Sequence, residues 1–180
     1  RGLWGYSGTT AEGRGLTVQS TGMGGPSAAL VLSDLGELGV ERAVRVGTCA
    51  AIDPEFRPGE LVWVRAARPW SADHPGAGSP AHPDEALAER LRTALGEEAK
   101  PGRVASVDFL HPSPDPAHAI PDGDVADMQT AALFAAGRRL GIALAAVLVV
   151  TDAEDSETLD DESLVKRAET AAQAALTALL

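Results

Sequence analysis

Apolar and polar positions along the chain repeat with two different periods, which predicts strands and helices in turn. Runs of apolar residues typical of strands occupy 16–20, 43–46, 60–64, 103–107 and 142–151. Spacing typical of helices marks 26–38, 84–99, 128–140 and 161–180. Stretches rich in Pro, at 69–83 and 111–124, are expected to form loops.

This alternation favours an α/β fold made of one domain, residues 1–180. We expect a mixed, mostly parallel central sheet flanked by helices. In such a sheet, ligands bind beyond the carboxyl ends of the strands. Unusual residues lie at three strand ends, 20–25, 45–49 and 151–152, and a fourth group, 127–129, starts a helix. The topology therefore predicts that these groups converge on one site.

Charge and cysteine content narrow the functional classes. The net charge of −11 argues against nucleic acid and anionic membrane as partners, because both need a basic surface. The most apolar run, 142–150, is too short to cross a membrane. Cys49 is the single cysteine, so no intrachain disulfide is expected and a reducing cytoplasm is the default location. The four histidines lack the spacing of a metal site.

One charged side chain interrupts an otherwise apolar strand. Arg45 needs an anion beside it, since burying an unpaired guanidinium costs several kcal/mol. Its planar donors suit phosphate oxygens, and Thr48 adds a hydroxyl. A structural salt bridge explains the arginine equally well. Cys49 could be a nucleophile, although inert packing is the commoner role of a small thiol.

Two further strand ends carry candidate chemistry. Gly22, Gly24 and Gly25 leave the backbone open before a helix, where an anion or a sugar could approach, although a tight turn also requires glycine. Asp152 ends the most hydrophobic strand and suits a general acid. The alternative for Asp152 is a cap for the acidic segment that follows.

Five segments, in this order, resemble motifs of the nucleoside phosphorylase family, which includes the hexameric bacterial purine nucleoside phosphorylases and the uridine phosphorylases. RGLWGYSGTTAEG is similar to the family's hairpin, and STGMGGPSAAL to its glycine-rich turn and helix. VRVGTCAAID resembles the phosphate segment, VADMQTAAL the acid-Met-Glu helix start, and VVTDA the strand end that carries the purine-side aspartate.

The resemblance implies a reaction and a role for each matching residue. The resemblance implies that a purine nucleoside would be cleaved by inorganic phosphate to free base and ribose 1-phosphate, with no metal or organic cofactor. Asp152 and Arg45 would be the catalytic residues. The implied contacts are phosphate by Arg45, Thr48 and Gly22; ribose by Met23, Met128 and Gln129; and base by Cys49, Ala50, Asp127, Asp152 and either Phe109 or Leu110.

The chain also departs from the family pattern. Gln129 stands where the family has a glutamate that binds the ribose hydroxyls, and an acidic run replaces the arginine expected after Asp152. If Gln129 contacts the ribose, its replacement by Glu is expected to raise ribonucleoside turnover. The segment that precedes the hairpin in the family, with a second phosphate loop, is not among these residues.

The alternatives are a uridine phosphorylase, a nucleosidase that uses water, and a weakly catalytic nucleoside-binding homologue. The 111–124 loop lacks the Gln and Arg expected for reading uracil, and the related nucleosidases lack an arginine at position 45. By analogy with the family, we expect a cytoplasmic homodimer or a hexamer built as a trimer of dimers.

Overall fold

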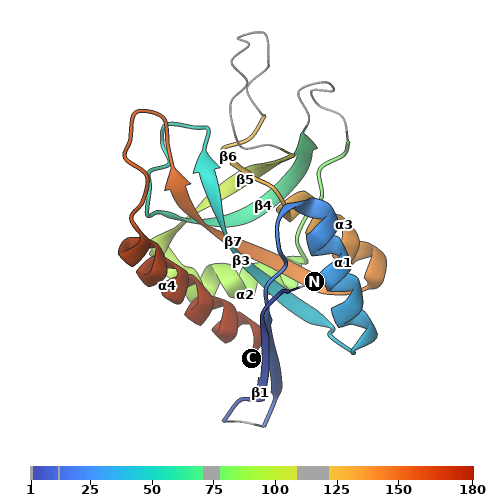
Figure 1. Cartoon of the computed structure of the whole chain (residues 1–180). Coiled ribbons are helices and arrows are strands. Elements are labelled where there is room, and N and C mark those ends of the chain that lie inside the picture. Colours follow the sequence, from blue (N-terminus) through green and yellow to red (C-terminus); the bar gives the residue numbers. More distant parts are fainter. Residues whose placement is uncertain (1, 12, 71–77, 109–121) are drawn as a thin grey trace.

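The computed structural model describes residues 2–11, 13–70, 78–108 and 122–180 (Figure 1). Strands and helices alternate along most of the chain. The strands are β1 (Gly5–Thr9), β2 (Gly15–Gln19), β3 (Arg42–Ala51), β4 (Leu61–Trp70), β5 (Ala99–Val107), β6 (Val125–Asp127) and β7 (Ala143–Asp152). The helices are α1 (Gly24–Glu37), α2 (Glu85–Leu95), α3 (Thr130–Leu140) and α4 (Asp161–Leu179), with a short 3₁₀ turn at Gly96–Glu98.

Five of the strands close into a barrel in the order β3-β6-β5-β4-β7. The β3–β7, β4–β5 and β5–β6 pairs are parallel, whereas β3–β6 and β4–β7 are antiparallel. The expected α/β domain with a mixed, mostly parallel sheet is therefore confirmed. The sequence did not predict that this sheet closes into a barrel.

Helices cover the barrel on two sides, and each side has its own apolar cluster. Helices α1 and α3 pack on one side, through residues such as Leu32 and Phe134, against the strands (Figure 1). Helices α2 and α4 pack on the other side, through Leu91 and Ala174. Strand β7 contributes side chains to both clusters and is buried along almost its whole length, as a central strand covered on both faces should be.

The hairpin of β1 and β2 projects from this body (Figure 1). Among the described strands, β1 and β2 pair only with each other, so one edge of β2 has no strand beside it. A cleft of about 580 Å³ lies between the hairpin, α1 and the first half of β3. We call this space the hairpin cleft. Leu32 and Leu35 of α1 line it, as do Thr21 and Arg45.

Several predicted boundaries were wrong. The predicted loop at 69–83 overlaps β4, which runs on to Trp70, and Ala81 bridges back to Ala67. The helix predicted over 84–99 ends at Leu95, because Gly96 adopts a positive φ of 57° that terminates it, and β5 already begins at Ala99. Strand β6 was not predicted at all. No helix within the described residues is both long and apolar enough to span a membrane.

Candidate active site

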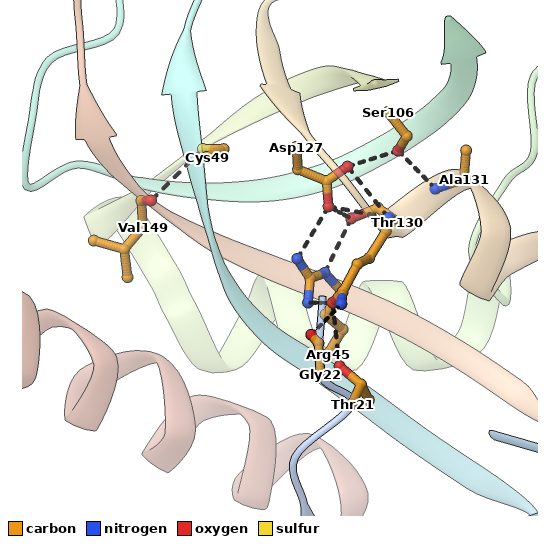
Figure 2. Close-up of polar contacts among 10 residues, drawn as sticks. Thr21, Gly22, Arg45, Cys49, Ser106, Asp127, Thr130, Ala131 and Val149 are labelled. Carbon is orange, nitrogen blue, oxygen red and sulfur yellow. Dashed lines mark hydrogen bonds and ion pairs between the residues drawn. The ribbon is translucent and has the colours of Figure 1, made fainter. Parts of the chain in front are cut away.

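Arg45 meets its anion within the protein. Its Nη2 lies 3.0 Å from Oδ2 of Asp127, and the two side chains are only 11% and 1% exposed. Its Nη1 donates to Oε1 of Gln129 at 2.7 Å, and its Nε donates to Oγ1 of Thr130 at 3.2 Å (Figure 2). The acceptors come from the end of β6 and the start of α3, more than 80 residues further along the chain. The structural salt bridge considered from the sequence is therefore present.

The Asp127 carboxylate is held on every side. Ser106 donates to Oδ1 at 2.6 Å, and the Thr130 hydroxyl donates to Oδ2 at 2.6 Å. The backbone N–H of Thr130 also donates to this carboxylate, so Asp127 caps the first turn of α3. Ser106 in turn accepts from the backbone N–H of Ala131. A buried carboxylate with this many donors has little freedom to turn away from Arg45.

Gln129 joins the glycine-rich turn to the arginine. Its Oε1 accepts from Arg45 and, at 3.1 Å, from Oγ1 of Thr21, while its Nε2 donates to the carbonyl oxygen of Gly22 at 2.6 Å. The side chain is 6% exposed. Three of the four predicted groups, 20–25, 45–49 and 127–129, thus meet through hydrogen bonds. We call Thr21, Gly22, Arg45, Asp127, Gln129 and Thr130 the arginine cluster.

Gly47 makes room for the arginine. The guanidinium folds back along its own strand, and a Cβ on Gly47 would lie 2.6 Å from the guanidinium carbon. Side chains at positions 45 and 47 share one face of β3 because a strand alternates with a period of two. The absence of a side chain at position 47 therefore leaves the space that the guanidinium of Arg45 occupies.

Cys49 lies on the same strand but does not join the cluster. Its thiol is 3% exposed and points to the carbonyl oxygen of Val149 on the neighbouring strand, 3.7 Å away (Figure 2). Burial, and secondarily the negative charge of Asp127, raise the pKa of this thiol far above its ordinary value. A thiol that stays protonated is a poor nucleophile, so the inert packing considered from the sequence fits the structure.

Asp152 ends β7 beside Ala50 of β3. Its oxygens accept from the hydroxyls of Thr151 at 2.6 Å and Thr158 at 2.9 Å, and the residue is exposed. Ala50 lies five residue steps along β3 from Arg45, at a rise of roughly 3.3 Å per step. Asp152 and the arginine cluster therefore lie at separate points along β3 and β7. A ligand would have to extend between them to contact both.

The other predicted site residues are scattered around the cluster. Met23 precedes α1 and is 80% exposed, whereas Met128 and Ala50 are half-buried. Thr48 is exposed, and strand alternation puts its side chain on the face of β3 opposite to Arg45. Phe109 and Leu110 lie outside the described residues.

Sequence reasoning missed Thr130 and also Ser106, which holds Asp127 from outside the cluster, and it gave no role to Thr21 within the 20–25 group. A detectable signal existed for Thr130. An acid three residues before the first helical amides, as in Asp127-Met128-Gln129-Thr130, is typical of an N-terminal cap, and such a cap carboxylate is oriented by the helix. Ser106 and Thr21 carry no comparable local signal.

Comparison with known proteins identifies the family of the chain. The phosphorylase superfamily matches the chain over residues 2–180. A guanosine phosphorylase of Halorubrum lacusprofundi is 33% identical over 150 residues, which cover 77% of this chain and 61% of that protein. A DeoD-type purine nucleoside phosphorylase of Bacillus cereus is 31% identical over 163 residues, 84% of this chain and 69% of that protein.

The fold has a solved counterpart too. The structure of a purine nucleoside phosphorylase from Toxoplasma gondii, in complex with immucillin-H, superposes with a TM-score of 0.83. The match covers 99% of this chain and 78% of that one, at 21% sequence identity, and so supports the fold alone. The chain spans 61% of the length of the guanosine phosphorylase. From the match over nearly all its residues, the chain belongs to the phosphorylase superfamily.

Proposed function

We propose that the protein cleaves the N-glycosidic bond of a purine nucleoside with inorganic phosphate, giving free base and ribose 1-phosphate. The observation that carries the proposal is the arginine cluster, in which the 21–22 turn, Arg45 and the start of α3 meet. These are the segments that the resemblance assigned to ribose and phosphate. The two relatives named above are a guanosine and a purine nucleoside phosphorylase, which favours a purine over uridine.

The chemistry needs one bond to form as another breaks. A phosphate oxygen attacks C1′ of the nucleoside while the bond from C1′ to the base nitrogen breaks, and the electron pair leaves with the base. Arg45 holds the phosphate in line, which is a positioning and electrostatic contribution. Asp152 donates a proton or a hydrogen bond to N7 of the departing purine. A general acid of this kind typically contributes about 10²–10⁴-fold to the rate.

The remaining roles follow the same arrangement. Exposed Met23, which follows the 21–22 turn, and half-buried Met128, which precedes Gln129, would pack on the ribose. Gly22 and Thr48 would border the phosphate. Cys49, Ala50 and Asp127 would line the base side together with Phe109 or Leu110. Because its side chain lies on the face of β3 opposite to Arg45, Thr48 would reach the phosphate from the other side of the strand, near the irregularity in the β3–β7 pairing at 49/50.

We further propose that the enzyme works in the cytoplasm as a homodimer or a trimer of dimers. The free, buried Cys49 suits a reducing compartment. Sedimentation velocity of the purified chain measures the assembly directly. A monomer at micromolar concentration would contradict this part of the proposal.

The decisive assay is release of free base with and without phosphate. Inosine, guanosine, adenosine and uridine are each incubated with the protein, and free base is measured by chromatography. We expect release from purine nucleosides that depends on inorganic phosphate. Release without phosphate would instead identify a nucleosidase, and a preference for uridine would identify a uridine phosphorylase. Binding without any release would identify a nucleoside-binding homologue.

The variant Arg45→Lys tests the arginine itself. Lysine keeps the charge but loses the planar, multiple donors, so the KM for phosphate is expected to rise about tenfold or more. The KM for nucleoside should change much less. Arg90→Lys, on an exposed position of α2, is the matched control and should behave as the unmodified protein. Equal changes in both KM values would show that Arg45 serves only the fold.

A further inference from the structure

The carboxyl group of Asp152 is contacted by two hydroxyl groups, one on each of its oxygens. Oγ1 of Thr151 lies 2.6 Å from Oδ2, and Oγ1 of Thr158 lies 2.9 Å from Oδ1. Among the described residues, no lysine or arginine forms an ion pair with Asp152. An exposed side chain without such contacts samples several rotamers. The two hydroxyls therefore restrict the orientation of this carboxyl group at the end of β7.

The two hydroxyls are not equivalent. Oγ1 of Thr151 also lies 3.2 Å from the carbonyl oxygen of Cys49, so its single proton is shared between two acceptors. Thr158 lies six residues beyond Asp152 in the sequence, across the loop that follows β7. In the described part of the chain, Asp152 is the one hydrogen-bond partner of the Thr158 hydroxyl. Thr158 is therefore the more specific of the two contacts.

The backbone of the loop after β7 brings Thr158 to Asp152. The loop turns at Asp155, which has a positive φ of 58°. It then returns to the strand, where the N–H of Leu159 donates to the carbonyl oxygen of Thr151 at 2.8 Å. The side chain of Leu159 packs against the apolar cluster of α2 and α4. Since these contacts do not involve the Thr158 hydroxyl, removing that hydroxyl should leave the loop in place.

The carboxyl group still has room for a ligand. A carboxylate offers about four lone-pair positions, two on each oxygen. The hydroxyls of Thr151 and Thr158 take one position on each oxygen of Asp152. Each oxygen thus keeps a position for a hydrogen bond to a departing base, and the residue is exposed to solvent.

We propose that Thr158 is the positioning residue for Asp152 and holds its carboxyl group in the orientation that meets N7 of the departing purine. The inference rests on the proposed function for the role of Asp152. Without the hydroxyl, the carboxyl group would rotate, and a misoriented acid assists bond cleavage less often. Because the acid is needed when the bond breaks, the loss should fall on kcat, with little change in the KM for nucleoside.

Thr158→Val and Thr158→Ser test the hydroxyl. Valine has the shape of threonine without the hydroxyl, whereas serine keeps the hydroxyl. Phosphorolysis of inosine by the full chain is measured at saturating phosphate. Thr158→Val is expected to lower kcat about three- to tenfold, the order of effect of one hydrogen bond. Thr158→Ser should retain most of the activity.

Thr177→Val is the matched control. Thr177 is exposed on α4, and its hydroxyl donates to the carbonyl oxygen of Gln173 in the same helix at 3.0 Å. The substitution removes a hydroxyl of the same kind far along the chain from Asp152, so kcat and KM are expected to stay unchanged.

A double-mutant cycle separates positioning from support of the loop. If Thr158 acts through Asp152, Thr158→Val has little further effect on kcat once Asp152→Asn has removed the acid. If the two losses multiply instead, Thr158 does not act through Asp152 and the proposal is overturned.

Crystal structures of the unmodified protein and of both Thr158 variants show the carboxyl group directly. We expect a second orientation of Asp152 in Thr158→Val and the original orientation in Thr158→Ser. An unchanged orientation in Thr158→Val would overturn the proposal, as would equal losses of kcat in the two variants or no loss in either. If the unmodified chain releases no base at all, the proposed function fails, and the crystal structures still decide whether Thr158 orients Asp152.

Discussion

The guanidinium of Arg45 lies over Gly47, and this contact links a residue with no side chain to the most polar group of the core. Its donors reach Asp127, Gln129 and Thr130 only because the side chain can run along β3. A buried ion pair contributes little net stability while both partners are present. Removing or displacing one partner is costly, because the other charge is then buried without compensation.

Gly47→Ala tests this contact. The added Cβ would approach the guanidinium carbon to 2.6 Å, so the flexible end of Arg45 must move away from its acceptors. We expect the stability to fall by about 1–3 kcal/mol, as for a buried polar group left without its partner. Phosphate binding should fall as well. Denaturant unfolding and calorimetry measure the two effects.

Gly8→Ala is the matched control for that variant. A Cβ on Gly8, in β1, would meet nothing within 4 Å. Stability and anion binding are expected to stay close to those of the unmodified protein. If Gly8→Ala and Gly47→Ala have the same stability and the same phosphate affinity, the close approach at Gly47 affects neither property.

At the scale of single residues, the sequence indicated that Arg45 needs an anion but not which residue supplies it. An arginine within an apolar strand predicts an anion, and that prediction is correct. The sequence could not show that the anion is Asp127, 82 residues away, because the pairing depends on how β6 and α3 return to β3. Phosphate stays a prediction, since a ligand at Arg45 must share the guanidinium with this carboxylate.

Helix caps decide where the elements begin. Asp160 precedes α4, and its carboxylate accepts from the backbone N–H of Ser163 at 2.9 Å and from the Ser163 hydroxyl at 2.7 Å. These hydrogen bonds, the backbone one first, lower the pKa of Asp160 below its ordinary value. The carboxylate therefore favours the folded helix when it is ionised.

The sign of the pH effect follows from the lowered pKa. Stabilisation by Asp160 is fully present above the ordinary aspartate pKa of about 3.9 and is lost as the pH falls through the lower, folded value. Asp160→Ala is expected to lower the thermal midpoint by about 2–4 °C at pH 7. The difference from the unmodified protein should shrink below about pH 4.

Asp160→Asn provides the comparison, because an asparagine side chain caps a helix without titrating. Its midpoint should lie near that of the unmodified protein at pH 7. A difference between Asp160→Ala and the unmodified protein that is the same at pH 7 and pH 3 would contradict the assigned role of the carboxylate.

The order of elements could be predicted, but several of their ends could not. Periodicity identified α2 through Leu87, Leu91 and Leu95, which are all buried. It also carried the helix too far, because the residues after Gly96 remain compatible with a helix until tertiary pairing draws Ala99 into β5. Strand β6 has three residues, too few to show any alternation.

The molecule has two parts that differ in how far they are packed against other elements. The barrel strands are covered by helices on both sides, and β7 pairs with both β3 and β4. The β1–β2 hairpin pairs with no other described strand, and Trp4, Tyr6 and Val18 on it are more than 60% exposed. Local opening is expected to follow this difference in burial.

Amide hydrogen exchange measures that opening. Amides of β7 should exchange only with global unfolding, whereas those of β2 should exchange by local opening of the hairpin and be faster by orders of magnitude. Mass spectrometry of peptides covering 15–19 and 143–150 gives both rates in one experiment. Equal protection of the two strands would show that the hairpin is held by contacts beyond its own pairing.

The closure of the barrel could not be predicted from the pattern of apolar and polar residues. The sheet is mostly parallel, as predicted, but its closure depends on the antiparallel β3–β6 and β4–β7 contacts, of two and three residue pairs. Such short pairings join distant segments and have no local signature. The site depends on them, since the pairing of Ala50 with Ala126 brings Asp127 toward β3.

The space over Gly47 also constrains how this chain can change over generations. A side chain at position 47 would displace the guanidinium from its present place, so the pairing of Arg45 with Asp127 is favoured by the glycine. Once Arg45 and Asp127 are paired, losing either alone leaves a buried charge behind. Substitutions at these three positions are therefore expected to be coupled, and related chains should tend to replace the three together or keep all of them.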